Sequence, residues 1–406
     1  MKILVFNAGS SSLKYKLFEA RSADNMEVLA QGCVEAIGTE HARLHAGDVD
    51  REVSAASCRD ALPLALEELT GPDGPLDGLE AVDAIGHRVA HGGEYFGCSV
   101  PVDADVVAKI EEVAHLAPLH NPSALEVIDR CHALMPLRLQ VAAFDTAFHQ
   151  TMPARNYVYP IPYRYYEDYG IRRFGFHGTS HKYVSRRAAQ FLGKHTYDLK
   201  MITCHLGAGA SLAAIDHGIS MDTTMGYTPL DGIMMGTRSG SLDPAIIMAI
   251  MEKEGLTPQQ MDDVLNKESG LLGVSGVSGD LRLLKEAVAV GDERAELAYD
   301  IFLTSIRRQI GAYLFELAGV DCIVCTAGVG ENDPYARRLI FRGLEPFGIC
   351  IDQERNMAVT GNEDAIISTD DSQVSVLVIP TDEEAEIARD VMLISQGEDI
   401  SDPYKY

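Results

Sequence analysis

The chain has 406 residues, with 34 lysines and arginines against 60 aspartates and glutamates, a formal net charge of −26. Proteins that bind nucleic acid or anionic membrane surfaces need a basic face, so this balance argues against both partners. No apolar run approaches the roughly 18 residues of a membrane helix. The apolar start turns polar at Asn7, too early for a signal peptide, and eight scattered cysteines suit a reducing compartment. We therefore expect a cytoplasmic protein of two or three domains.

The first part of the chain predicts a strand hairpin followed by a helix. Residues 3–6 are apolar and enter a glycine- and serine-rich turn, after which residues 13–18 alternate between apolar and polar side chains, as a half-buried strand does. The cluster of prolines and glycines in residues 71–78 marks a surface loop. Residues 104–116 place their apolar side chains along one helical stripe.

A second strand–turn–strand unit follows about two hundred residues later, with residues 201–204 and 212–215 on either side of another glycine-containing turn. A long amphipathic helix is predicted over residues 297–318, a strand over 322–325 with a third turn at 328–332, and a strand over 374–379. A final helix over 383–394 would begin after Thr381 or Asp382 as its N-cap. Two such units predict a mixed α/β chain built from a duplicated domain.

Several common catalytic patterns are missing from the sequence. It has no P-loop, no dinucleotide-binding G-x-G-x-x-G after the first strand, and no G-x-S-x-G nucleophile elbow. Cys322 and Cys325 match C-x-x-C, but they lie within a predicted strand, whose alternation points the two sulfurs to opposite faces. A metal or redox role for this pair is therefore disfavoured.

The first turn has the composition of an anion-binding loop. Asn7, Ser10, Ser12 and Lys14 share the turn and its exit strand, where backbone N–H groups, hydroxyls and one ammonium can surround an anion. An ordinary polar hairpin would look the same, so this turn alone decides nothing.

Further clusters favour phosphoryl transfer. Arg88 and Arg238 each lie among glycines and apolar residues. A guanidinium group there can donate hydrogen bonds to two oxygens of a phosphate or carboxylate at once. His177 lies beside aromatic residues, Asp145 stands in an apolar segment, and Glu383 begins the final helix. Each residue alone could be an ion-pair partner, a core histidine or a cap. Together they are the set that transfers phosphoryl groups, with cations on the phosphate oxygens and acids on Mg²⁺.

Long strings of the chain resemble the acetokinase family. Residues 5–14, VFNAGSSSLK, look like the first acetate kinase signature, and residues 172–181, RRFGFHGTSH, look like the second. Further family blocks follow in order at residues 87–93, 117–122, 236–244, 327–332 and 380–384, so the resemblance covers nearly the whole chain.

The resemblance implies duplicated actin-like, ribonuclease H-like domains with an active-site cleft between them, one formed by residues 1–149 and 382–406 and the other by 150–381. It implies Mg²⁺-dependent transfer of the γ-phosphoryl group of ATP to acetate, giving acetyl phosphate and ADP, with Mn²⁺ as a possible substitute metal. Family members are homodimers, so we expect a homodimer here.

The resemblance also assigns roles to individual residues. It implies catalytic roles for Asp145, Arg88, His177 and Arg238, and metal binding by Asn7 and Glu383. It places the acetate pocket, with Arg88, at Ala90, Leu119, His120, Phe176 and Pro229. The residues implied to bind nucleotide and phosphate are Ser10, Ser12, Lys14, His205, Leu206, Gly207, Ala208, Gly209, Asp280, Leu281, Arg282, Gly328, Val329, Gly330, Glu331 and Asn332.

Two departures from the family pattern matter. Ala208 stands where the family usually has Asn, which removes a side-chain donor from the second turn and bears on ATP binding. Ala90 stands where the family usually has Val, and the larger space predicts some use of propionate. The alternatives are a propionate- or butyrate-preferring kinase, a nucleotide sensor without catalysis, and a sugar kinase. The retained charged residues argue against the sensor, and two arginines favour an anionic acceptor over a sugar hydroxyl.

Overall fold

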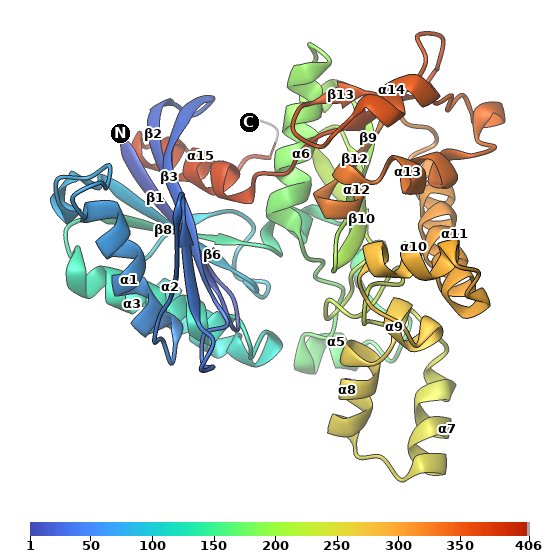
Figure 1. Cartoon of the computed structure of the whole chain (residues 1–406), viewed down its shortest axis with the longest axis horizontal. Helices are drawn as coiled ribbons and strands as arrows, with labels where there is room; N and C mark the ends of the chain where they lie inside the picture. The colour runs from blue at the N-terminus through green and yellow to red at the C-terminus, as the bar shows by residue number, and fades with distance from the viewer. Residues whose placement is uncertain (404–406) are drawn as a thin grey trace. The chain divides into compact units, whose positions relative to one another are not determined.

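The computed structural model describes residues 1–403 and divides the chain into two compact units (Figure 1). Unit 1 comprises Met1–Gln150 and Asp382–Tyr406, and unit 2 comprises Thr151–Thr381. No helix within residues 1–403 is both long enough and apolar enough to cross a membrane.

Unit 1 is built on an eight-stranded sheet in the order β5-β4-β3-β2-β1-β6-β8-β7. Its first three strands form antiparallel pairs, and β6 and β8 then run parallel to β1. The strands are β1 (Lys2–Ala8), β2 (Leu13–Ser22), β3 (Asn25–Glu35), β4 (Arg43–Ala46), β5 (Val49–Glu52), β6 (Ala84–Val89), β7 (Val100–Pro101) and β8 (Leu139–Phe144).

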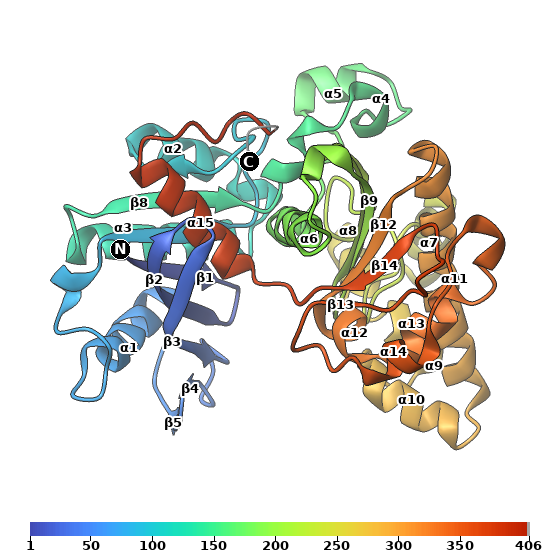
Figure 2. The ribbon, with the colours of Figure 1, turned by 90° about the horizontal axis from the view of Figure 1, so that it is seen from above.

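Helices cover both faces of this sheet because the consecutive residues 3–6 of β1 are all apolar and point alternately to opposite sides. Leu4 and Phe6 pack beneath α1 (Cys58–Thr70) and α3 (Asn121–Leu134). Ile3 and Val5 pack against Ile387 and Val391 of α15 (Glu383–Ser395), so the end of the chain supplies the second cover (Figure 2). The contact at β6 is close, since a Cβ on Gly86 would lie 2.5 Å from Ile387 Cγ2.

His87 of β6 is buried in unit 1 and makes the stability of the fold depend on pH. Its Nε2 lies 2.7 Å from Gln140 Oε1, and burial lowers the pKa of His87 from 6.5 to about 4. Between these values the unfolded chain binds a proton that the folded chain does not. His87 therefore leaves the free energy of unfolding undiminished above pH 6.5 and lowers it as the pH falls toward 4. The total decrease is roughly 3 kcal/mol, at about 1.4 kcal/mol per pKa unit.

Replacing His87 by Met should flatten this dependence. We expect the free energy of urea unfolding to fall less between pH 7 and pH 4.5 in His87→Met than in the wild type. Exposed His132 on α3 provides the control, since His132→Met should keep the wild-type slope. An unchanged slope in His87→Met would show that His87 does not set it.

Unit 2 repeats the strand order of unit 1. Its six-stranded sheet runs β11-β10-β9-β12-β14-β13, with β11, β10 and β9 antiparallel and β9, β12 and β14 parallel. This is the arrangement of β3-β2-β1-β6-β8, so the predicted α/β duplication is confirmed. The strands are β9 (Lys200–Leu206), β10 (Ala210–Asp216), β11 (Ile219–Thr223), β12 (Cys322–Thr326), β13 (Ala365–Ile366) and β14 (Ser375–Val378).

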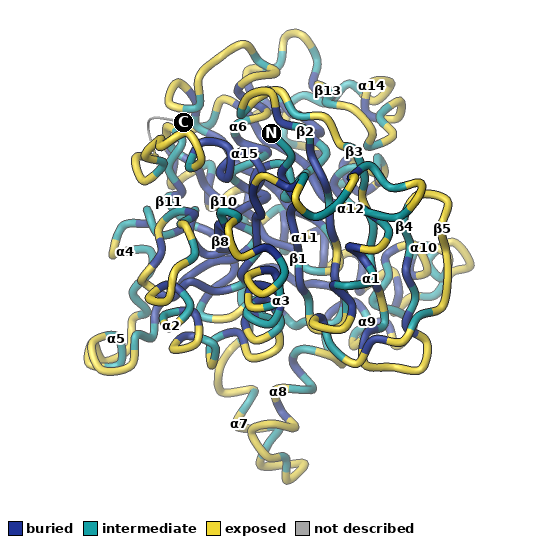
Figure 3. Tube along the Cα trace, turned by 90° about the vertical axis from the view of Figure 1, so that its left-hand side faces the viewer, coloured by how far each residue is buried: buried dark blue, intermediate teal, exposed yellow. Residues whose placement is uncertain are grey.

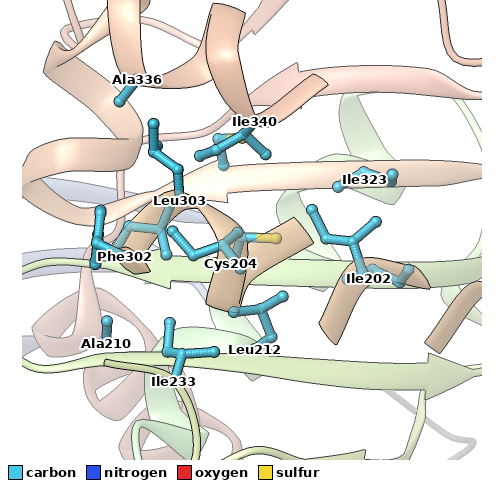
Figure 4. Packing of buried hydrophobic residues seen from close by; sticks show 14 of the residues in the cluster. Ile202, Cys204, Ala210, Leu212, Ile233, Phe302, Leu303, Ile323, Ala336 and Ile340 are labelled. Atoms are coloured by element: carbon cyan, nitrogen blue, oxygen red, sulfur yellow. The ribbon is translucent and has the colours of Figure 1, made fainter. Parts of the chain in front are cut away.

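The core of unit 2 lies between its sheet and α11 (Glu293–Glu316). Phe302 and Leu303 of α11 meet Ile202 and Leu212 of the central strands, and Ile340 of α13 (Pro334–Phe341) completes the cluster (Figure 4). The helix α6 (Gly178–Phe191) contacts β9 and β12. The other helices are α4 (Ala154–Tyr157), α5 (Arg164–Tyr169), α7 (Pro244–Glu254), α8 (Pro258–Lys267), α9 (Gly270–Ser275), α10 (Leu281–Ala289), α12 (Ala327–Asn332) and α14 (Gln353–Ala358).

Three predicted elements differ from the observed ones. The helix predicted over 104–116 is α2 (Ala104–Glu112), after which the chain tightens into a 3₁₀ turn at Ala114–Leu116, ahead of Pro118. The long helix begins at Glu293, four residues earlier than predicted, because the Asp292 side chain accepts from two backbone N–H groups there. The predicted turn at 328–332 is the short helix α12.

Candidate active site

Three of the predicted residues of unit 1 lie at the carboxyl ends of neighbouring parallel strands. Asn7 pairs with Arg88 in the register of β1 and β6, and Asp145 directly follows β8 beside Arg88. In open α/β sheets, ligands bind at this edge. The sheet therefore brings Asn7, Arg88 and Asp145 together.

Asp145 holds the Arg88 guanidinium by several hydrogen bonds. Arg88 Nε donates to Oδ1 at 3.0 Å and to Oδ2 at 3.1 Å, and Nη2 donates to Oδ2 at 2.5 Å. The Asp145 side chain is 3% exposed. Burial alone would lower the pKa of Arg88, but Asp145 and Glu383 outweigh it and raise the pKa. Arg88 is thus a fixed cation, and Asp145 has the geometry of a residue that orients it.

The beginning of α15 brings further carboxylates to this cluster. Glu383 Oε2 lies 4.0 Å from Arg88 Nε, and Glu384 Oε1 accepts from Asn7 Nδ2 at 3.4 Å. Asn7 Oδ1 accepts from Arg88 Nη1 at 2.9 Å. Burial raises the pKa of Glu383 to about 7, and Asp145 and Glu384 add to this rise, while Arg88 and Lys14 oppose it. An additional cation near Glu383 would stabilise its charged form.

The first glycine- and serine-rich turn is tight and anchored. Gly9 N–H donates to the Ser12 carbonyl at 2.8 Å, and the Cys58 thiol at the start of α1 lies 3.5 Å from the Gly9 carbonyl. Ser10, Ser12 and Lys14 follow one another along this turn and into β2, where Lys14 pairs with Asn7 across the hairpin. Lys14 is exposed at the same end of β1 as the Asn7–Arg88 cluster.

The predicted acetate-pocket residues are divided between the units. Unit 1 contains Ala90, which directly follows β6, and also Leu119 and His120 ahead of α3. Leu119 is 64% exposed, unusual for a leucine. Unit 2 contains Phe176, which is buried in its core cluster, and Pro229.

His177 in unit 2 is held in a strained conformation and a polar network. It lies at the N-cap of α6 with a backbone φ of +56°, a conformation that residues other than glycine seldom adopt. His177 Nδ1 lies 2.9 Å from Ser211 Oγ, which is 2.8 Å from His181 Nε2. The His177 ring also stacks on His205, with centroids 4.1 Å apart. These contacts fix the direction of the imidazole.

The second glycine-containing turn lies against His177 and Arg238. Gly209 shows the proximity, because a Cβ built there would be 3.4 Å from Arg238 Nη1 and 3.6 Å from the His177 ring. The turn closes with a bond from Gly207 N–H to the Gly209 carbonyl at 3.1 Å, and the Ala208 carbonyl accepts from Gly236 N–H. Residues 205–209 therefore bring backbone N–H groups, an imidazole and a guanidinium to one place.

Within residues 1–403, Arg238 is a cation that forms no ion pair with a carboxylate. Its Nη1 lies 3.3 Å from the Pro229 carbonyl and 3.7 Å from Met235 Sδ. Burial lowers the pKa of Arg238, but arginine remains charged at neutral pH. A half-buried cation with these neighbours suits an anionic ligand.

The predicted adenosine-binding segments lie near this turn. Asp280 caps α10 by accepting from Arg282 N–H, and the Arg282 side chain is 86% exposed and paired with Asp280. The helix α12 begins at Ala327, whose Cβ lies 3.7 Å from the position that a Cβ on Gly207 would take. Within α12, the Glu331 carboxylate accepts from Ala327 N–H at 2.7 Å and from Thr381 N–H at 3.0 Å, so it anchors the backbone.

Sequence reasoning assigned no role to several residues of these clusters. His181 lies four residues after His177 and so on the same side of α6, a spacing that could have identified it. Ser211 directly follows the second turn. Lys16 and Glu384 are joined by contacts across more than 360 residues of sequence, for which no local signal exists.

The cluster in unit 1 can contribute to a Mg²⁺ site but does not enclose one. In the described part of the chain, no group of three or more His, Cys, Asp or Glu side chains is placed to hold a metal. Mg²⁺ in kinases is held by one or two carboxylates together with substrate phosphates and water. Glu383 is a partly buried carboxylate of this kind, 18% exposed at the start of α15, and a bound cation would favour its charged form.

Comparison with known proteins agrees with these features. The profile of the acetokinase family matches residues 2–389. The acetate kinase of Caldanaerobacter subterraneus subsp. tengcongensis is 51% identical over 404 residues, covering 98% of this chain and 100% of that protein. The crystal structure of Porphyromonas gingivalis acetate kinase has a TM-score of 0.92 at 44% identity, covering 97% of this chain and 99% of the other. A propionate kinase from Francisella tularensis has a TM-score of 0.87 at 39% identity, covering 96% and 98%. The chain therefore belongs to the acetokinase family.

Proposed function

We propose that this protein is an acetate kinase, which transfers the γ-phosphoryl group of ATP reversibly to acetate and so forms acetyl phosphate and ADP. The observation that carries this assignment is the half-buried guanidinium of Arg238 beside the second turn, matched in unit 1 by Arg88 fixed on Asp145. Both substrates are anions, and each arginine suits a phosphate or a carboxylate.

The chemistry follows from the charges of the reactants. Acetate is ionised at pH 7 and needs no general base. One carboxylate oxygen forms a bond to the γ-phosphorus as the bond from that phosphorus to the β–γ bridging oxygen breaks, and ADP leaves with that electron pair. Arg88, His177 and Arg238 stabilise charge on the transferring phosphoryl group, while the two glycine-containing turns bind phosphate oxygens. Asp145 keeps Arg88 aligned.

Mg²⁺ supplies charge neutralisation of the nucleotide phosphates when it is bound, and Mn²⁺ can replace it. Glu383 is the carboxylate that would hold it, with Asn7 beside it. In nucleotide binding, we assign the base end to residues 280–282 and 328–332, and the phosphates to Lys14 and residues 205–209.

Trapping the product tests this function directly. The protein is incubated with ATP, Mg²⁺ and hydroxylamine, and acetate, propionate or butyrate is added in separate reactions. Hydroxylamine converts the acyl phosphate formed to a hydroxamate, and acetate should give the highest kcat/KM. Absence of hydroxamate from every acid would overturn the kinase assignment.

Propionate is the second candidate acceptor, favoured by Ala90. A valine at this position would add two methyl groups, and one methylene changes specificity by about 10- to 200-fold. We expect Ala90→Val to lower kcat/KM for propionate about tenfold relative to that for acetate, measured with the hydroxamate assay. An unchanged ratio would remove Ala90 from the acyl pocket.

We also propose that the protein is a homodimer, supported by the apolar surface of α7. None of the eleven residues of α7 is buried, even though most of them are apolar (Figure 3). Ile246 is 46% exposed and Met248 is 65% exposed. A second copy of the chain would remove this surface from water.

Light scattering after gel filtration measures the mass in solution. It should give twice 44.1 kDa for the wild type and a monomer for Met248→Glu. Met357→Glu, at an equally exposed methionine of α14, is the control and should stay dimeric. A dimeric Met248→Glu would place the interface elsewhere.

A further inference from the structure

Lys16 of β2 is joined to both neighbours of Glu383. Its Nζ lies 2.8 Å from Asp382 Oδ1 and 3.8 Å from Glu384 Oε2, and the three side chains are only 16%, 28% and 17% exposed. The residue between these two acids is Glu383, the proposed metal ligand. A partly buried pair of this kind is screened less than a surface ion pair.

The contacts of Lys16 also fix the start of α15. Asp382 Oδ1, the oxygen that Lys16 reaches, accepts from Ala385 N–H at 2.9 Å and so caps the helix. Glu384 uses its other oxygen, Oε1, to accept from Asn7 Nδ2. Both residues that flank Glu383 therefore contact the first hairpin of the chain. Asp382 contacts Lys16, and Glu384 contacts both Lys16 and Asn7.

Lys16 differs in this respect from Lys14, which lies on the same face of β2. Residues two apart on a strand share a face, and Lys14 is exposed whereas Lys16 is turned onto the acids of α15. The Lys16 side chain is only 16% exposed, and its ammonium contacts the carboxylates of Asp382 and Glu384. Lys16 thus has the geometry of a support and not of a substrate ligand.

We propose that Lys16 is a positioning residue, which orients Glu383 toward the metal by holding Asp382 and Glu384 on either side of it. The proposal rests on the proposed function, because that function makes Glu383 the metal ligand. Without Lys16, two like charges flank Glu383 uncompensated and the first turn of α15 loses its tether to β2. The carboxylate should then spend less time in the orientation that binds metal.

Equilibrium binding of Mn²⁺ in the presence of ADP, followed by the electron paramagnetic resonance signal of free Mn²⁺, tests this without turnover. We expect Lys16→Met to weaken Mn²⁺ binding about tenfold, to leave ADP binding without metal within about twofold, and to lower kcat more than it raises KM for acetate. Lys16→Arg should restore most of the binding. Lys109→Met, which removes a lysine paired with Asp105 on α2, far in sequence from α15, is the matched control and should behave as the wild type.

A double-mutant cycle shows whether Lys16 acts through Glu383. If it does, Lys16→Met added to Glu383→Gln should cause no further loss of Mn²⁺ binding. Additive losses, or wild-type Mn²⁺ binding by Lys16→Met, would overturn the proposal. If Lys16→Met does not fold, Lys16→Gln, which retains a hydrogen-bond donor, takes its place in the cycle with a smaller expected loss. A wild type that forms no hydroxamate would refute the proposed kinase, while the cycle would still report on the coupling of Lys16 to Glu383.

Discussion

Replacing Arg238 by Ala should lower kcat for acetyl phosphate formation by roughly 10²–10³-fold, the usual cost of removing one preorganised donor from a developing charge. The reason is the position of Arg238 beside Gly209 and His177, with no carboxylate partner in the described part of the chain to neutralise it. KM for acetate should change less than kcat, because the interaction is strongest in the transition state. Arg238→Lys should recover only a small part of the rate, because an ammonium cannot reproduce a planar two-pronged contact.

The control for Arg238→Ala is Arg308→Ala, which removes an exposed arginine of α11 in the same unit. Its kcat should equal that of the wild type. Thermal unfolding of both variants checks that the fold is intact. An Arg238→Ala variant that keeps a third or more of the wild-type kcat would exclude Arg238 from charge stabilisation.

Replacing Asp145 by Asn should reduce both activity and stability. The amide introduced by Asp145→Asn would retain one acceptor oxygen but no charge, so Arg88 would lose the partner that fixes three of its hydrogen bonds. Breaking a buried ion pair costs about 3–5 kcal/mol, and the 20% exposure of Arg88 favours the lower value. We expect kcat to fall about 10²-fold, in line with loss of an aligned donor.

The Mg²⁺ dependence of Asp145→Asn separates two roles for Asp145. If Asp145 only orients Arg88, as its hydrogen bonds indicate, the Mg²⁺ concentration for half-maximal rate should change less than about twofold, whereas loss of a metal ligand would raise it about tenfold or more. The larger rise would make Asp145 a metal ligand. Asp129→Asn, which removes an exposed partner of Arg59, is the control and should leave kcat, Mg²⁺ dependence and stability unchanged.

The parts of the site that could be predicted are those encoded locally. Residues 7–14 and 205–211 combine an apolar strand with a glycine-containing turn, and such a turn places its polar groups at a strand end wherever the strand lies in the sheet. The alternation of residues 13–18 likewise determines which face is buried. The duplicated α/β fold follows from finding this pattern twice, and the matching strand orders confirm it.

The rest depends on contacts between distant segments. Lys16 and Asp382 are 366 residues apart, and the packing of α15 on the sheet of unit 1 brings them together. The glycines of α12 predict a turn and not a helix. The observed helix begins at Ala327, which has φ of +61°, and the Glu331 carboxylate accepts a hydrogen bond from the Ala327 N–H there. Neither effect leaves a periodic signal in the sequence.

The position of α15 has a consequence for how the protein is made. All strands of the first sheet have been synthesised once the chain is about 150 residues long. Ile3 and Val5 on one face of that sheet stay uncovered until Ile387 and Val391 have been synthesised. All 231 residues of Thr151–Thr381 leave the ribosome in between. The unit that is begun first is therefore completed only after the other unit has been synthesised, and its uncovered apolar face is the surface that chaperones would need to shield until α15 has formed.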